Sequence, residues 1–71
     1  MASSGQKAET IRRVLEAVRQ GEEVTTGELL RETGLPVLDL IASARHLVES
    51  GHLDVREERR ADLIVLSYRR R

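Results

Sequence analysis

Residues 25–55 read TTGELLRETGLPVLDLIASARHLVESGHLDV, and this stretch decides the fold. At 100° per residue, the segment from Pro36 to Ser50 divides into two sides, as an amphipathic helix does. The apolar side is predicted to face the core and holds Val37, Leu40, Ile41, Ala44, Leu47 and Val48. The opposite side is predicted to face a partner and holds Leu38, Asp39, Ala42, Ser43, Arg45, His46 and Glu49.

The residues before this helix predict a short helix and a turn. Thr25 and Glu28 have the spacing of a capping box, in which each side chain accepts a hydrogen bond from the backbone amide of the other residue. Gly34 suits the left-handed conformation that ends a helix. Pro36 is tolerated in the first turn of a helix, where its missing amide hydrogen has no partner to lose. We therefore expect a short helix that ends at Thr33, followed at once by the longer one.

The N-terminal part of the chain predicts a loose start and a first helix. Residues 1–5 are small and polar and are expected to be loose. The apolar residues that follow recur at helical spacing up to Gly21, which is expected to end an amphipathic helix. Val24 stands alone as an apolar β-branched residue, and we expect it to pair with a strand from later in the chain.

The C-terminal part predicts an antiparallel hairpin, because the apolar period changes from 3.6 to 2 after Gly51. A first strand is expected around Leu53 and Val55, a charged turn over residues 57–61, and a second strand from Asp62 to Tyr68. Residues 69–71 are expected to be a basic tail. Helices followed by a hairpin place the chain in the α+β class, as a single domain over residues 1–71.

The composition limits the classes of function that the chain can have. The 71 residues contain twenty Leu, Ile and Val, one Tyr and no Phe, Trp or Cys. Aromatic stacking of single-stranded bases and disulfide or thiolate metal sites are therefore excluded. The longest apolar run, Leu63–Leu66, is far too short to span a membrane, so we expect no membrane association and a cytoplasmic location.

The charges are balanced overall but not along the chain. Twelve Lys and Arg oppose twelve Asp and Glu. Residues 55–71 hold six Arg against three acidic residues, which gives this segment a net charge of +3 and leaves residues 1–54 with −3. We therefore expect any anion-binding surface to lie at the C-terminal end.

This order of elements resembles the winged helix-turn-helix superfamily of bacterial and archaeal regulators. The resemblance is carried by residues 26–30 (TGELL), 33–36 (TGLP), 47–53 (LVESGHL) and by a wing from Val55 to Tyr68. It implies a three-helix fold with a C-terminal β-hairpin wing, and a double-stranded DNA-binding protein that regulates transcription. In DNA-binding members the second helix of the motif enters the major groove, while the wing contacts the backbone or minor groove.

Carried over by position, the resemblance implies a DNA-binding set on the helix and the wing. Its residues are Asp39, Ala42, Ser43, Arg45, His46, Arg56, Arg59 and Arg60. Three of the four arginines have an alternative role. Arg59 and Arg60 either contact phosphates or pair with the adjacent Glu57 and Glu58, and Arg45 either reaches DNA or pairs with Glu49 four residues on.

A second hypothesis, from a different class, is a winged-helix module that binds another protein and no nucleic acid. Its surface would be apolar, because large aliphatic residues lie outside the predicted core. One of the two faces of the second wing strand, Leu63 with Val65 or Ile64 with Leu66 and Tyr68, is expected to lie outside the core. The predicted interface consists of Leu38, Ile64, Leu66 and Tyr68. A homodimer through this surface would also supply the second half-site that helix-turn-helix proteins commonly bind.

Catalytic chemistry is not predicted. The sequence contains no glycine-rich phosphate loop and no serine in a nucleophile-elbow context. His46 and His52 lie six residues apart without a third ligand in the pattern, so we expect no metal site. We accordingly predict no catalytic residue, no cofactor and no enzymatic activity.

Overall fold

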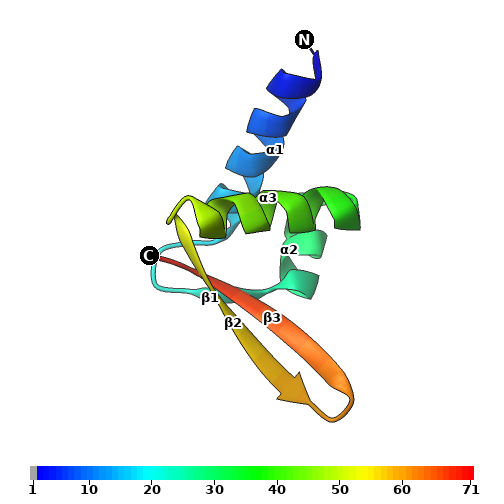
Figure 1. The fold of residues 1–71 in the computed structure, drawn as a ribbon, viewed down its shortest axis with the longest axis vertical. Coiled ribbons are helices and arrows are strands. Elements are labelled where there is room, and N and C mark those ends of the chain that lie inside the picture. The colour runs from blue at the N-terminus through cyan, green and yellow to red at the C-terminus, as the bar shows by residue number, and fades with distance from the viewer. Residues whose placement is uncertain (1) are drawn as a thin grey trace.

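The computed structural model describes residues 2–71, with side chains described from Ala8 onward. Within this part of the chain, three helices and a three-stranded antiparallel sheet form an α+β fold. The elements are α1 (Ala2–Ala17), β1 (Glu23–Thr25), α2 (Thr26–Thr33), α3 (Val37–Glu49), β2 (Leu53–Arg60) and β3 (Leu63–Arg70). Figure 1 shows α3 lying across the molecule, with α1 extending to one end and the β2–β3 hairpin extending to the other.

The first helix starts earlier than the sequence predicts. α1 begins at Ala2, so residues 2–5 belong to the helix and the expected loose start is wrong for them; Met1 lies outside the described residues. Ala has the best helix propensity and Ser a moderate one, whereas Gly5 costs about 1 kcal/mol relative to Ala, so this extension depends on the part of the helix that the core stabilises further on. The helix ends at Ala17, and Gly21 turns the chain toward β1 with φ of 82°.

The second helix begins and ends as the sequence predicts. Thr25 Oγ1 accepts from the Glu28 amide at 3.2 Å, and Glu28 Oε1 accepts from the Thr25 amide at 2.9 Å. The hydrogen bond from the Thr25 backbone amide, helped by the Thr25 hydroxyl, lowers the pKa of the Glu28 carboxyl. Gly34 ends α2 with φ of 66° and donates to the Leu30 carbonyl. Pro36 then forms the N-cap of α3.

The sheet has the strand order β1-β3-β2, so β3 is its central strand. The expected pairing of Val24 is confirmed, because Val24 lies opposite Tyr68. The hairpin is longer than expected. The predicted charged turn over residues 57–61 is wrong, since β2 continues to Arg60 and only Ala61 and Asp62 connect the strands. Charged side chains are compatible with a strand where they face solvent, so the charge of this segment did not mark a turn.

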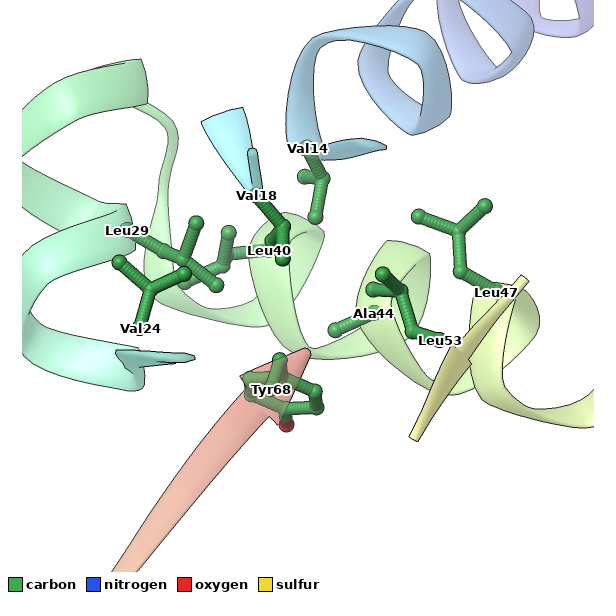
Figure 2. Packing of buried hydrophobic residues seen from close by; sticks show 9 residues of the cluster. All are labelled: Val14, Val18, Val24, Leu29, Leu40, Ala44, Leu47, Leu53 and Tyr68. Atoms are coloured by element: carbon green, nitrogen blue, oxygen red, sulfur yellow. The ribbon is translucent and has the colours of Figure 1, made fainter. Parts of the chain in front are cut away.

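The core is a single aliphatic cluster that receives residues from all six elements and the adjoining loop (Figure 2). Its buried members are Val14, Val18, Val24, Leu29, Leu40, Ala44, Leu47, Leu53 and Tyr68. Tyr68 supplies the aromatic ring of the cluster, which its register places between Val24 and Val55. The sheet therefore packs on the helices at its base, and the distal part of the hairpin lies beyond the cluster.

The C-terminal arginines are not a tail, contrary to the sequence prediction. β3 continues through Arg70, whose guanidinium Nε donates to the Val18 carbonyl at 2.6 Å and whose Nη2 donates to the Leu15 carbonyl at 2.9 Å. The Leu15 carbonyl also accepts from the Val18 amide at 3.2 Å, so Arg70 adds a second donor to this carbonyl and supplies a donor to the carbonyl of Val18, the residue after α1. Arg71 forms an ion pair with Asp54 at 3.0 Å.

Replacing Arg70 by Ala is expected to lower the free energy of unfolding by about 2 kcal/mol, because two charge-assisted hydrogen bonds are lost from a half-buried site. Arg71→Ala removes only an exposed ion pair and is expected to cost less than about 1 kcal/mol. Urea denaturation followed by circular dichroism measures both changes. Equal losses in the two variants would show that the contacts of Arg70 with α1 do not hold the fold together.

Replacing Ala61 by Gly is expected to stabilise the protein. Ala61 occupies the first turn position of the hairpin with φ of 53°, a left-handed conformation that costs an L-residue about 1–2 kcal/mol and costs glycine nothing. After the greater freedom of glycine in the unfolded chain is counted, a gain of about 0.5–1 kcal/mol remains. The matched control is Ala42→Gly in the middle of α3, which should lose about 1 kcal/mol. Denaturation midpoints that move in the same direction for both variants would contradict the assigned turn.

Candidate functional site

The outward side of α3 carries most of the residues predicted to bind a partner. Leu38 is 79% exposed, the highest value among the large apolar residues in the described chain. Asp39, Ala42, Arg45 and His46 are exposed as well. These five side chains lie within two turns of one another, so they form a continuous surface, which we call the α3 surface.

Ser43 does not belong to this surface, and its predicted DNA contact is wrong. Its side chain is 5% exposed and lies on the core side of α3. Leu40, Ser43, Ala44 and Leu47 have the spacing i, i+3, i+4 and i+7, which is one helical stripe. The pattern of apolar residues alone does not reveal this phase, because a serine is small enough to lie inside the stripe.

Because the buried stripe of α3 includes Ser43, the core side of the helix is rotated from its predicted position. Two residues that were predicted to lie in the core are therefore exposed. Val37 is 52% exposed and Ile41 is 42% exposed. Both lie one residue from a member of the α3 surface, next to Leu38 and Ala42 respectively. The N-terminal half of α3 is therefore more apolar on its outward side than the sequence analysis predicted.

Only part of the predicted protein interface is exposed. Tyr68 is 5% exposed and Leu66 is half-buried against the core, so neither is open to a partner as predicted. The central position of β3 explains this, because its base is flanked by β1 and β2 and covered by helices. Ile64 remains 58% exposed near the hairpin turn, and Leu63, which belongs to the alternative face of the strand, is 70% exposed there.

The arginines of the hairpin differ in their partners. Arg56 pairs with Glu23 of β1 at 3.6 Å, and Arg60 Nη2 pairs with Glu58 at 2.9 Å. Arg59 makes no ion pair with any described residue, and it lies opposite Ile64. The predicted pairing with adjacent glutamates is thus formed by Arg60.

The candidate surfaces do not carry the net positive charge that the sequence suggested. Residues 53–64 contain three arginines and four acidic residues, a net charge of −1. The excess of +3 in the C-terminal segment arises from residues 69–71, and two of these are engaged at the base of the sheet through Val18, Leu15 and Asp54. On α3, Arg45 pairs with Glu49 at 3.7 Å.

Metal and membrane binding receive no support from the described residues. Among them, no three His, Asp or Glu side chains come together in a way that could hold a metal ion. No helix in this part of the chain is long and apolar enough to cross a membrane. The most exposed large apolar side chains among the described residues lie on α3 and near the hairpin turn.

Comparisons with protein-family models, curated proteins and solved structures give no match to this chain. Its function is therefore argued from its own residues.

Exchanging serine and alanine at positions 43 and 42 tests whether Ser43 lies on the core side of α3 and Ala42 on the outward side. Ser43→Ala is expected to raise the free energy of unfolding by about 0.5 kcal/mol, since alanine has the better helix propensity and suits the core side. The reverse change at the exposed neighbour, Ala42→Ser, should lower it by a similar amount. Chemical denaturation measures both. A loss of more than about 1 kcal/mol in Ser43→Ala would instead assign the hydroxyl a necessary hydrogen bond.

Proposed function

We propose that this chain is a winged helix-turn-helix domain that binds double-stranded DNA and acts in transcription regulation. The observation that carries the proposal is the open outward side of α3, which no other described element covers, together with a hairpin that extends beyond the core. In this interpretation α2 and α3 form the helix-turn-helix, joined by the turn at Gly34, and the β2–β3 hairpin is the wing.

The wing would supply the contacts to phosphates. Arg59 has a free guanidinium among the described residues, and the pairs of Arg56 and Arg60 are exposed to solvent. Exposed ion pairs contribute at most about 1 kcal/mol, so phosphate can replace their glutamates at small cost. Three phosphate contacts would give a slope of about −2.7 in a plot of log K against log salt concentration. The expected binding is weak at physiological salt and depends on the DNA lying against both surfaces.

The α3 surface would lie in the major groove, where side chains reach base edges. Arg45 is placed for a guanine or a phosphate once it leaves Glu49, an exposed pair of small energy. A single domain of this size reads one half-site, so we expect a dimer or a partner protein to supply the second half-site.

The proposal is tested by titrating the isotope-labelled protein with a mixed-sequence duplex at low salt and again at physiological salt, with NMR shifts as the readout. Shifts are expected at Leu38–His46 of α3 and at Arg56–Arg60 of the hairpin, and they should weaken with salt. Absence of shifts at these residues at low salt would reject DNA binding.

Charge-reversal variants of the wing measure how much its arginines contribute to DNA binding. Arg59→Glu with Arg60→Glu should abolish binding at physiological salt and reduce the salt slope by about 1.8. The matched control is Arg12→Glu with Arg19→Glu, which makes the same change in net charge on exposed positions of α1 and the residues after it. If both pairs weaken binding equally, the effect reports net charge and the wing has no specific role.

A second candidate function is a winged-helix module that docks on another protein through α3. It is favoured by the adjacent exposed side chains of Val37, Leu38 and Ile41, which together form an apolar area on the first turns of the helix. Under this alternative, Leu38→Glu abolishes partner binding while the double charge reversal on the wing leaves it intact.

A further inference from the structure

The α3 surface offers few groups that can hydrogen-bond a base. In the first two turns of the helix, the outward side chains of Val37, Leu38, Ile41 and Ala42 are all apolar, and all are exposed. Asp39 is the polar exception, and an ionised carboxylate accepts hydrogen bonds but donates none. Arg45 and His46 follow only in the next turn. This composition restricts the base edges that the helix can recognise.

Purines need donors that this part of α3 lacks. Guanine is read by Arg or Lys that donate to O6 and N7, and adenine by Asn or Gln that donate and accept at N6 and N7. No Lys, Asn or Gln occurs anywhere in α3. Arg45 could meet one guanine, but the four apolar positions cannot read a purine edge.

Pyrimidine edges match the same positions well. The C5-methyl group of thymine is an apolar group in the major groove, and the N4 amino group of cytosine is a donor that a carboxylate accepts. Leu38 and Ala42 lie one turn apart on one line of the helix, and Asp39 lies beside Leu38. A pyrimidine that carries a C5-methyl group would therefore meet aliphatic side chains, and a cytosine amino group would give Asp39 a partner that offsets its repulsion from the phosphates.

We propose that α3 recognises DNA by the C5-methyl groups of pyrimidines, through Leu38, Ile41 and Ala42, with Asp39 accepting from a cytosine amino group. This inference rests on the proposed DNA binding and names the base edges that the same surface would read. The shared chemistry is the methyl group, which thymine and 5-methylcytosine both present. Burial of one methyl group against aliphatic side chains is expected to change the affinity about fourfold.

The test compares three short duplexes of one mixed sequence by fluorescence anisotropy at low salt. The first is unmodified, the second has deoxyuridine in place of every thymidine, and the third has 5-methylcytosine in place of every cytosine. The thymine methyl group is assigned by a loss of about fourfold or more in the deoxyuridine duplex, and the cytosine methyl group by a comparable gain in the third duplex. If both modified duplexes bind within twofold of the first, methyl recognition is rejected although DNA binding stands. If none of the three duplexes binds, the proposed DNA binding itself fails.

Variants show whether Leu38 makes the methyl contact. Leu38→Ala should bind all three duplexes with nearly equal affinity, and it should fold normally because the side chain is almost fully exposed. The matched control is Leu63→Ala, which removes an equally large exposed leucine near the hairpin turn and should keep the discrimination of the unchanged protein. If Leu38→Ala still binds the three duplexes with different affinities, the role of this side chain is overturned. Altered duplex shape, rather than a contact of Leu38 with the methyl group, would then explain the difference in affinity.

Discussion

The contact of Arg70 with the end of α1 joins the C-terminal end of the central strand to the first helix. Two guanidinium nitrogens bind the carbonyls of Leu15 and Val18, more than fifty residues away in sequence. Because Arg70 ends the central strand, this contact fixes β3 against the first helix. β1 and β2 pair on either side of β3, and Tyr68 lies in the core between Val24 and Val55. A small aliphatic core gains little from each contact, so two charge-assisted hydrogen bonds across the chain matter more here than in a larger domain.

Much of the fold could be predicted from local signals. The capping box at Thr25 and Glu28 and the left-handed Gly34 act within a few residues, and so their outcome does not depend on tertiary packing. The pairing of Val24 with the hairpin was also foreseeable, since an isolated β-branched residue has few other ways to be buried. What escaped prediction was decided by contacts distant in sequence. The role of Arg70 is the clearest case, because nothing in the run of three arginines marks the one that meets α1.

The candidate site was predicted less well because helix phase and strand length are set by the whole molecule. An assignment based on apolar residues placed Ile41 inside and Ser43 outside, whereas the structure reverses them. Serine at a core position is neutral to hydropathy counting, so only its i+3 and i+4 relation to Leu40 and Leu47 could have revealed it. Tyr68 was assigned to an interface because both sides of the second hairpin strand are apolar. The third strand resolves this, since a central strand has less need of a polar side than an edge strand has.

The charge distribution links the two surfaces of the proposed DNA-binding site. Residues 53–64 of the hairpin carry a net charge of −1, so the long-range attraction of this segment to phosphates is small and provides little affinity that is independent of sequence. A protein with a weak general attraction to DNA must obtain its binding energy at particular sites, and in the proposed complex α3 would be the surface that supplies that energy. Its apolar side chains then have a role that a basic helix would not need, because each buried methyl group adds affinity only at sequences that present one. If the chain binds DNA as proposed, weak electrostatics and an apolar α3 surface would act together, and sequence recognition would carry a larger share of binding than phosphate contact.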